Sequence, residues 1–490
     1  MVHMTSGTGT RLRTFERAVS VRIAESALTL NGVLRMERLH RWLTVRKLKE
    51  AFDVRRIAFE QLRKWSVAPD TGNLAHESGK FFSVEGLSVA VSDGPVKEWS
   101  QPILNQPEVG ILGILVKEID GVLHCLMQSK MEPGNADGVQ LSPTVQATRS
   151  NYSQVHKGRP VPYLHYFRDT AGHRVLADVL QSEQGSWFYR KRNRNMIVEV
   201  TTDVEVIDGF CWVTIGQLHS LLSEYDLINM DARTVLSCLP FSAAGIASLF
   251  SFGGDDFRSS VIRSFSEDNG SLHSSGDVLS WITESRVGND VATKLIPLDE
   301  TTGWRRTSHA ITHESEAFFD IIAVDVSAES REVDGWSQPM ISPRSTGLVA
   351  FLVKRISGVL HVLVNARVEP GYLDVIELAP TVQCSPENYG HLPPDARPAY
   401  LDDVLEAPEG AVRYDTILSE EGGRFFKAQN RYLVIEVGDG EHEEVRRDFR
   451  WLTVHQLTAL IRHSHYVNVQ ARSLVACLHS LSCGVAGGNG

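Results

Sequence analysis

The sequence contains two copies of one unit in tandem, and this duplication limits the folds open to the chain. The motif Trp-Ser-Gln-Pro at 99–102 recurs 237 residues later at 336–339. Between 99–152 and 336–389 the copies align without a gap, and 25 of 54 positions are identical. A period this long does not suit a solenoid, so we expect each copy to fold as a domain-sized module.

Further motifs recur at the same displacement and mark positions that both copies retain. They are Gly-Val-Leu-His at 121–124 and 358–361, Glu-Pro-Gly at 132–134 and 369–371, Pro-Thr-Val-Gln at 143–146 and 380–383, and Asn-Tyr at 151–152 and 388–389. After a two-residue insertion, Asn-x-x-Ala-Arg at 229–233 matches 468–472.

The segments around the copies complete the expected domain plan. It comprises an N-terminal helical extension over 1–58, a first module over 59–248, a connector over 249–280, a second module over 281–482 and a disordered tail over 483–490. Leu, Arg and Lys at helical spacing from Arg35 to Trp65 indicate the extension. Nine serines in the thirty residues from Ser251 to Ser280 indicate a flexible connector.

Within each copy the pattern predicts strands first and helices last, an α+β arrangement. In the first copy, aliphatic runs at 110–117 and 122–128 flank an Asp-Gly turn, which is typical of a hairpin. Further strands are expected at 144–146 and 195–201. An amphipathic helix at 215–224 is expected to begin after Thr214 as its N-cap, with a second helix from Met230.

Composition excludes several classes of protein. The 49 basic and 60 acidic residues leave a formal net charge of −11, which disfavours general nucleic-acid binding. Neither a membrane-length apolar run nor the apolar region of a secretory signal is present. The six cysteines form no Cys-x-x-Cys pair, which favours reduced thiols in a cytoplasmic protein.

Neutral hydrogen-bonding side chains recur on one predicted strand of each copy. Because alternate residues of a strand share a face, Thr144 and Gln146 should point the same way, as should Thr381 and Gln383. Such groups suit a polar, uncharged ligand such as a base or a sugar. A solvated strand face is the alternative interpretation.

Aromatic side chains follow and precede these strands. A polar loop ending in Asn-Tyr comes after each strand, and its tyrosine can stack on a base; ordinary turn chemistry is the alternative. Trp65 and Trp304 precede the recurring His-Glu-Ser motif, and either a stacking wall or a core tryptophan fits them.

Charged residues mark two further candidates. The cationic run at 190–194 follows Gly185 and suits a diphosphate, with a solvated basic face as the alternative. In the second copy Gln140 and Gln184 are replaced by Glu377 and Glu421. Together with Glu369 and Glu420, these residues predict a cleft in copy two that is denser in carboxylates, which can act as general acids or bases.

Several cofactor motifs are missing from the sequence. It has no Gly-x-Gly-x-x-Gly after a strand, no P-loop, no Cys/His metal spacing and no Gly-x-Ser-x-Gly elbow.

The motifs together resemble the NDP-hexose 2,3-dehydratase family. They are Trp-Ser-Gln-Pro, Glu-Pro-Gly-Asn, Gln-Leu-Ser-Pro-Thr-Val-Gln-Ala-Thr, Gln-Ser-Glu-Gln-Gly-Ser-Trp and Lys-Arg-Asn-Arg-Asn in the first copy, and Glu-Glu-Gly-Gly-Arg and Asn-x-x-Ala-Arg-Ser-Leu in the second. The resemblance covers Phe59 to Leu481. It implies two Nudix-like modules, each a mixed sheet with flanking helices, and a homodimer without metal or redox cofactor. The Nudix box is absent, which disfavours metal-dependent hydrolysis.

The resemblance also implies a substrate and its chemistry. A dTDP-4-keto-6-deoxyhexose would lose its C3 proton to a base and then its C2 hydroxyl, giving a 3,4-diketo-2,6-dideoxy sugar for antibiotic deoxysugar pathways. A 3-ketoreductase would consume this product. Two nucleotide-sugar sites per subunit are implied, with copy two expected to be the reactive one. The alternatives are a non-catalytic nucleotide-sugar-binding protein and a Nudix hydrolase.

Site residues follow by motif. Glu421 or Glu420 is the expected base, while Arg367 and Arg424 would hold the diphosphate or the enolate. The expected binding residues of copy one are Trp65, Thr148, Arg149, Ser150, Asn151, Tyr152 and Ser186. Those of copy two are Trp304, Gln383, Cys384, Ser385, Asn388, Tyr389, Gly422, Gly423 and Arg424.

Overall fold

The computed structural model describes residues 18–149, 160–241, 256–267, 270–328, 335–438 and 440–483. The first half contains α1 (Val19–Leu28), α2 (Met36–Lys49), β1 (Phe52–Ile57), β2 (Trp65–Val67), β3 (Leu74–His76), β4 (Ser83–Val91), β5 (Glu98–Asn105), β6 (Gly110–Ile119), β7 (Val122–Lys130), β8 (Gln140–Ser142), β9 (Val145–Ala147), α4 (His165–Arg168), β10 (Arg174–Ser182), β11 (Phe188–Tyr189), β12 (Arg192–Glu199), β13 (Phe210–Thr214), α5 (Ile215–Leu222) and α6 (Met230–Leu236).

The second half repeats this order. It contains α8 (Phe257–Arg263), α9 (Ser275–Val287), β14 (Val291–Ile296), β15 (Trp304–Arg306), β16 (Ala310–His313), β17 (Phe319–Ala328), β18 (Gly335–Pro343), β19 (Gly347–Ile356), β20 (Val359–Val368), β21 (Ile376–Ala379), β22 (Val382–Cys384), α10 (Leu401–Leu405), β23 (Val412–Ser419), β24 (Gln429–Glu436), β25 (Phe449–Thr453), α11 (Val454–Ile461) and α12 (Val469–Ser482).

Each copy is built around a large mixed sheet. The first has the order β10-β12-β6-β7-β13, with β8 on β7 and β9 on β6. The second pairs β23, β24, β19 and β20 in the same way, with β21, β22 and β25 at the equivalent places. In both, the central pair is parallel and its neighbours are antiparallel. The predicted α+β class and the tandem duplication are confirmed.

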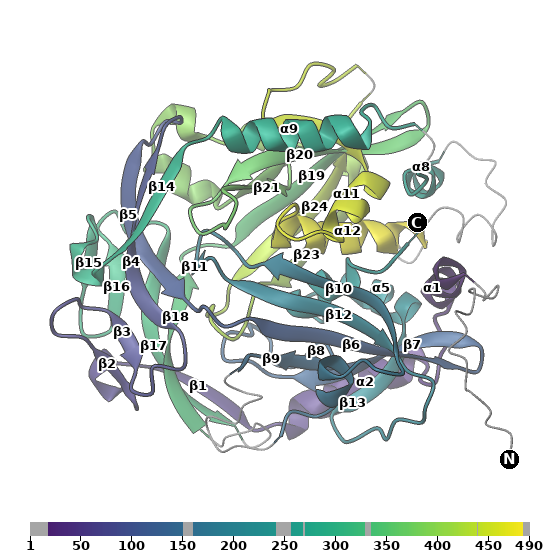
Figure 1. Ribbon diagram of the computed structural model, residues 1–490, viewed down its shortest axis with the longest axis horizontal. Coiled ribbons are helices and arrows are strands. Elements are labelled where there is room, and N and C mark those ends of the chain that lie inside the picture. Colours follow the sequence, from purple (N-terminus) through teal and green to yellow (C-terminus); the bar gives the residue numbers. More distant parts are fainter. Residues whose placement is uncertain are drawn as a thin grey trace, which may run out of the picture.

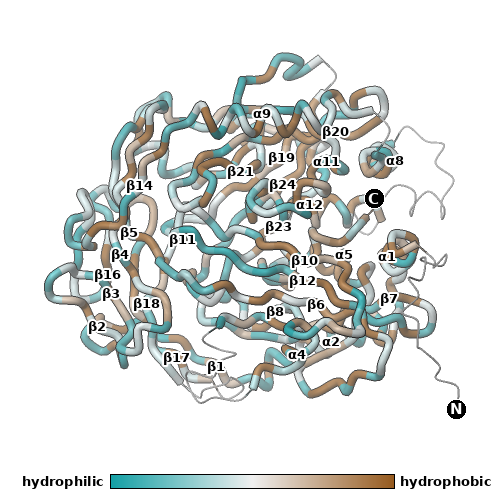
Figure 2. Tube along the Cα trace, in the orientation of Figure 1, coloured by the Kyte–Doolittle hydropathy of each residue, from teal (hydrophilic) through white to brown (hydrophobic). Residues whose placement is uncertain are grey.

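Helices join the two large sheets into one core. Residues of α5, α6, α11 and α12 are packed with the facing sides of both sheets, and Figure 1 shows α5 and α12 between them. Hydrophobic residues follow the central strands β6 and β19 in Figure 2. The outer faces are covered by α4 and α10, through residues such as Phe167 and Leu401. As predicted, Thr214 caps α5, because its hydroxyl accepts a hydrogen bond from Gln217 N at 3.1 Å.

Two smaller sheets exchange strands between the copies. β1 precedes the first module but pairs with β17 of the second, and β14 precedes the second module but pairs with β4 of the first. The two sheets face each other across a second core that includes Leu104 and Ile341, at the left of Figure 1. Each module is therefore completed by a strand from the segment that leads into the other.

Two segments differ from their predicted conformations. The helix expected from Arg35 to Trp65 is shorter in the structure. α2 ends at Lys49, and the strands β1 and β2 follow it. The serine-rich segment holds α8 and the start of α9, where Ser274 caps the helix by accepting from Asp277 N at 3.1 Å. Serine thus serves partly as a helix cap there, which composition alone does not distinguish from a flexible linker.

Three other expectations concern the whole chain. All six cysteines are free thiols. Every helix in the described ranges is too short or too polar to cross a bilayer. Of the expected tail at 483–490, only Cys483 lies inside the described residues.

Candidate functional site

Two loops cross between the modules and place residues of each module against buried residues of the other. The first crossing loop, residues 184–187, follows β10 and Glu183, and the second, residues 421–424, follows β23 and Glu420. Gly134 N donates to Gly422 O at 2.7 Å, and Gly371 N donates to Gly185 O at 2.8 Å. We call the region where Glu132 meets the second crossing loop site 1. The region where Glu369 meets the first crossing loop is site 2.

Glycine is required where each loop crosses. A Cβ on Gly134 would lie 1.7 Å from Phe425 O, and a Cβ on Gly371 would lie 1.9 Å from Phe188 O. The Glu-Pro-Gly motif therefore supplies a carboxylate to one site and a docking point for the loop that completes it.

A buried glutamate is held in site 1 by a chain of hydrogen bonds. Asn229, the N-cap of α6, donates to Gln146 Oε1 at 3.1 Å. Gln146 Nε2 then donates to Glu132 Oε1 at 2.9 Å, and Lys130 Nζ lies 3.6 Å from the same oxygen. Both ends of the glutamine amide are thus committed, so its role is to orient Glu132.

Site 2 repeats this chain around Glu369. Asn468 donates to Gln383 Oε1 at 2.8 Å, and Gln383 Nε2 donates to Glu369 Oε1 at 3.0 Å. Arg367 Nε adds a bond to Oε1 at 2.9 Å, and Ser186 N donates to Oε2 at 3.1 Å. The backbone after Gly185 thus approaches an anionic group, the carboxylate of Glu369.

The threonines predicted beside these glutamines are used within the sheet. Thr144 Oγ1 accepts from Leu115 N at 2.8 Å and donates to Leu126 O. Thr381 makes the equivalent pair of bonds. Their recurrence is explained by the need to bridge two strands.

Glu421 of the second module lies in site 1. Its Oε1 accepts from Gly423 N at 3.1 Å, while its enclosed Oε2 has no hydrogen-bond partner among the described residues. Burial raises the pKa of Glu421 to about 7 against the opposing charge of Arg424. The nearby carboxylates of Glu132 and Glu183 add to the rise.

Further titratable groups surround Glu421. Burial raises the pKa of Glu183 and brings that of Asp231 well above its usual value, and both interact electrostatically with one or more neighbouring carboxylates. Burial also lowers the pKa of Lys191 to about 8, although the charge of Glu183 opposes this. Site 1 can therefore both accept and donate a proton near neutral pH.

Site 2 is neutral at the corresponding positions. Glu421, Asp231, Arg424 and Lys191 of site 1 correspond to Gln184, Gln470, Trp187 and Ala428 of site 2. The four glutamates expected to share one cleft of copy two are thus divided, because the crossing loop takes Glu421 to site 1. At these four positions site 1 has ionisable side chains and site 2 has none, which the expectation for copy two did not include.

Glu420 and Glu377 make contacts between the modules, although Glu377 Oε1 has no hydrogen-bond partner among the described residues. Glu420 accepts from Asn430 Nδ2 and Tyr432 OH, each at 2.6 Å, and from Gln184 Nε2 across the module boundary. Glu377 is completely buried and accepts from Ser182 Oγ of the first module at 2.5 Å. Burial raises the pKa of Glu377 to about 7.

An aromatic cluster adjoins site 1. The ring of Trp65 lies 4.8 Å from that of Phe82 and 5.4 Å from that of His76. The guanidinium of Arg424 lies 4.5 Å from the centre of the Phe82 ring, which connects this wall to the second crossing loop.

The equivalent cluster adjoins site 2. Trp304 lies 4.8 Å from Phe319, and its indole N–H donates to Ser100 O at 3.0 Å. Phe318 N donates to Asn388 Oδ1 at 3.0 Å, which joins the wall to the Asn-Tyr loop.

The Asn-Tyr loops were predicted to bind ligand. In the second copy, burial raises the pKa of Tyr389 and brings that of Cys384 to about 12, and the charge of Arg367 opposes both shifts. Cys384 and Tyr389 therefore lie near Arg367 of site 2, and Arg367 is not among the charged neighbours of Glu421. In the first copy Thr148 is half-buried and Arg149 is exposed. Ser150, Asn151 and Tyr152 lie outside the described residues.

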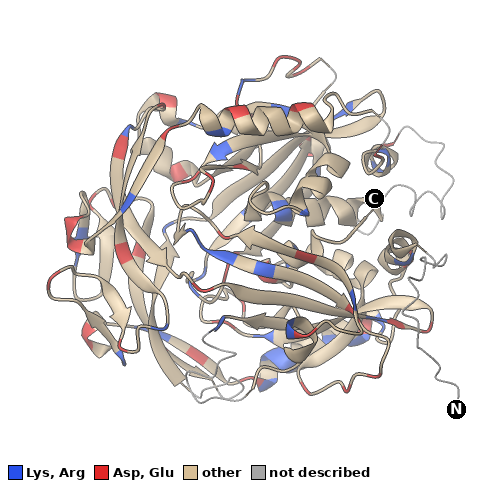
Figure 3. Cartoon of the chain, in the orientation of Figure 1, with Lys and Arg blue, Asp and Glu red and all other residues tan. Residues whose placement is uncertain are grey.

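The cationic run at 190–194 does not form one surface. Arg190 is exposed, Arg194 pairs with Asp178 at 2.6 Å, and Lys191 and Asn193 point inward. Burial alternates along the run, so its side chains point to opposite sides and do not form one basic surface. Figure 3 shows basic and acidic residues intermixed over the described elements in that view.

Four residues that the sequence analysis did not assign hold the crossing loops. Gln338 Nε2 donates to Gly423 O at 2.6 Å, Gln101 Nε2 to Ser186 O at 2.8 Å, Arg233 to Ser419 O at 2.5 Å and Arg472 to Ser182 O at 2.7 Å. All four belong to motifs that both copies retain, and this recurrence is the sequence pattern that could have identified them.

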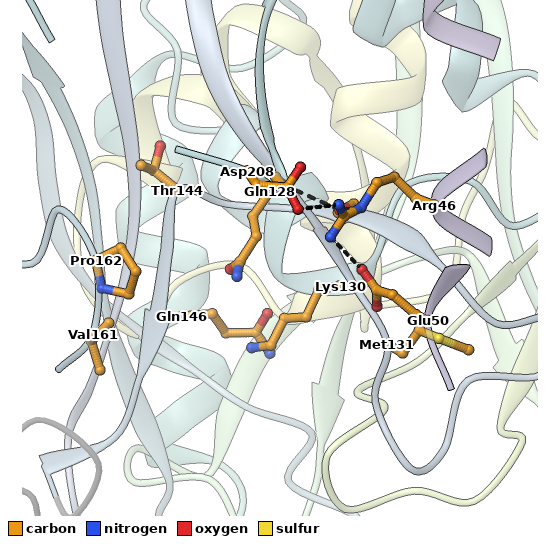
Figure 4. Close-up of a pocket in the computed structure, with 12 residues that line it drawn as sticks. Arg46, Glu50, Gln128, Lys130, Met131, Thr144, Gln146, Val161, Pro162 and Asp208 are labelled. Atoms are coloured by element: carbon orange, nitrogen blue, oxygen red, sulfur yellow. Dashed lines mark hydrogen bonds and ion pairs between the residues drawn. The ribbon is translucent and has the colours of Figure 1, made fainter. Parts of the chain in front are cut away.

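A polar pocket is lined by Lys130 and Gln146, which also contact Glu132, and by Arg46 of α2 (Figure 4). Arg46 on its far wall donates to Glu50 at 2.8 Å and to Asp208 at 2.7 Å. No cluster of three or more His, Cys, Asp or Glu suited to a metal ion occurs in the described ranges.

Comparison with known proteins identifies the repeated unit. The model of the NDP-hexose 2,3-dehydratase family matches residues 36–239 and 275–478. Three relatives named dTDP-4-dehydro-6-deoxy-alpha-D-glucopyranose 2,3-dehydratase are similar to the chain. The protein of Saccharopolyspora spinosa is 52% identical, covering 94% of this chain and 95% of the relative. The protein of Amycolatopsis orientalis is 49% identical over 95% of each chain, and that of Streptomyces violaceoruber is 46% identical over 90% and 96%. The chain therefore belongs to the NDP-hexose 2,3-dehydratase family.

Proposed function

We propose that the protein is a hydro-lyase that converts dTDP-4-keto-6-deoxyglucose into a dTDP-3,4-diketo-2,6-dideoxyhexose in deoxysugar biosynthesis. The names of relatives that are 46–52% identical over at least 90% of the chain support the substrate and the reaction. The observation that carries the mechanism is Glu421, a buried carboxylate beside Glu132 of the other module, with a pKa of about 7 and one oxygen that has no hydrogen-bond partner among the described residues.

Site 1 supplies the groups that this elimination needs. The C4 ketone acidifies the C3 proton, and Glu421 accepts that proton as the C3–H electrons form an enolate. Lys130 or Arg424 stabilises the enolate oxygen. The C2–O bond then breaks, and the hydroxide leaves as water with a proton from the pair Glu183 and Asp231. The resulting 2,3-enol takes up a proton at C2 and gives the 3,4-diketone, so no net oxidation occurs.

The two sites divide binding and chemistry in this proposal. Arg367, Gln383, Cys384, Ser385, Asn388, Tyr389 and Ser186 bind a nucleotide sugar in site 2 without turning it over. Trp65 and Trp304 provide a stacking wall for the base in their respective sites. Gly422 and Gly423 give the second crossing loop its close approach to site 1. Glu420 and Arg367 were both catalytic candidates by motif. In this proposal Glu420 makes a contact between the modules, and Arg367 is a binding residue of site 2.

A direct test is incubation with dTDP-4-keto-6-deoxyglucose in deuterated water, followed by mass spectrometry. We expect loss of one water and incorporation of deuterium at C2. Glu421→Gln should lower kcat by about 10²–10⁴-fold, the usual contribution of a general base. Glu420→Gln should keep more activity than Glu421→Gln. A Glu421→Gln enzyme with full turnover would exclude this base, and bound but unchanged substrate would favour a non-catalytic binding protein.

The remaining partners are also proposals. Family resemblance supports a homodimer in the cytoplasm and a downstream 3-ketoreductase that removes the reactive diketone. Light scattering that returned the mass of a single chain, 54.4 kDa, would exclude the dimer.

A further inference from the structure

The Trp-Ser-Gln-Pro motif of the second copy acts on the loop that carries Glu421. Trp336 Nε1 donates to Gln338 Oε1 at 2.8 Å, and Gln338 Nε2 donates to Gly423 O at 2.6 Å. A carboxamide has one acceptor end and one donor end. Because the tryptophan occupies the acceptor, the donor end of the buried Gln338 is directed at the loop.

Gly423, which Gln338 holds, in turn binds the carboxylate of Glu421. Gly423 N donates to Glu421 Oε1 at 3.1 Å, while its carbonyl is the acceptor for Gln338. A chain of hydrogen bonds therefore runs from Trp336 through Gln338 and Gly423 to one oxygen of Glu421. It leaves the other oxygen, Oε2, without a partner among the described residues.

We propose that Gln338 is a positioning residue, which fixes the second crossing loop so that Glu421 Oε2 faces the substrate carbon. The inference rests on the proposed function, because it takes Glu421 to be the base. Its importance follows from the steep dependence of proton transfer on geometry, since a displacement of about 1 Å can reduce the rate by about 10²-fold.

The first copy offers a matched comparison. Trp99 Nε1 donates to Gln101 Oε1 at 3.0 Å, and Gln101 Nε2 donates to Ser186 O at 2.8 Å, so the same clamp holds the first crossing loop. That loop carries Gln184 in the place of Glu421. The two clamps are alike in structure, but they hold different carboxylates: Gly423 N donates to Glu421 of its own loop, whereas Ser186 N donates to Glu369 of the second module.

The test uses Gln338→Glu, which keeps an acceptor for Trp336 and replaces the donor with an oxygen that repels Gly423 O. We expect kcat to fall about 10–100-fold while KM changes less than about threefold. Gln101→Glu makes the same change in the other copy. Gln101→Glu should lower the melting temperature by about as much as Gln338→Glu does, but it should change kcat less than about threefold.

The inference would be overturned if both variants lost kcat to the same extent and each loss followed the drop in melting temperature. It would also be overturned if Gln338→Glu folded and kept an unchanged kcat. If Gln338→Glu does not fold, Gln338→Met removes the donor without adding charge, and the same loss of kcat is expected. An inactive Glu421→Gln beside fully active Gln338 variants would refute the clamp alone. An active Glu421→Gln would refute the base on which it rests.

Discussion

Glu421 and Gln184 occupy equivalent positions in the two crossing loops and differ by one ionisable group. The amide of Gln184 is used on Glu420, whereas the carboxylate of Glu421 keeps one oxygen without a partner among the described residues. One exchange of amide for acid thus places an ionisable group on the second crossing loop where the first crossing loop has a neutral one.

The pH dependence of kcat/KM should report this group. Base catalysis requires the charged carboxylate, and burial raises the pKa of Glu421 to about 7, so the rate should increase as pH rises through about 7. Glu132→Gln removes a negative neighbour that disfavours the charged form, so the pKa of Glu421 should fall and the rising limb should move to lower pH. Steady-state values of kcat/KM between pH 5 and 9 measure the position of this rising limb.

Glu369→Gln is the matched control for this shift. It makes the same change in site 2, away from Glu421, and should leave the position of the limb unchanged. A limb that stayed in place or moved to higher pH in Glu132→Gln would show that Glu421 does not control the rate.

At the scale of elements, the crossing loops depend on Gly134 and Gly371. In Gly134→Ala the new Cβ would lie 1.7 Å from Phe425 O, so the second crossing loop must move and carry Glu421 with it. We expect kcat to fall at least tenfold and the free energy of unfolding to fall by about 1–3 kcal/mol, as for other overpacked sites. Thermal unfolding and kcat measure the two effects.

Gly371→Ala makes the same collision in site 2, where a Cβ would lie 1.9 Å from Phe188 O. It should cost similar stability and a smaller part of kcat. Equal loss of kcat in both variants would mean that the effect on site 1 is a general loss of structure.

Local elements could be predicted because their signals are local. The aliphatic run at 110–117 lies within β6 (Gly110–Ile119), and the helix expected at 215–224 is α5 (Ile215–Leu222) with its Thr214 cap. The crossing loops could not be predicted in the same way, since Gly134 meets Gly422, 288 positions away, through backbone atoms that have no side-chain pattern. The assignment of Glu421 to a copy-two cleft failed for this reason.

At the scale of the whole molecule, the two modules share their structure. β1 and β14 complete each other's sheets, and one continuous core includes helices of both modules. A module alone would expose the edge of β4 or β17 and an apolar helix face, and both are unfavourable in water. The repeated unit of the sequence is therefore a domain-sized copy that needs its partner copy.

Separate expression of the halves tests this interdependence. Residues 1–248 and 249–490 produced alone should aggregate or unfold, because each lacks the strand that completes its small sheet. Produced together, they should form a 1:1 complex that elutes like the intact chain and regains dehydratase activity, since the exchanged strands and the shared core do not need the connecting peptide bond. Size-exclusion chromatography, circular dichroism and the water-loss assay measure the three properties. A half that was monomeric and unfolded cooperatively by itself would show that the strand exchange adds little to stability, and that each copy is an independent domain after all.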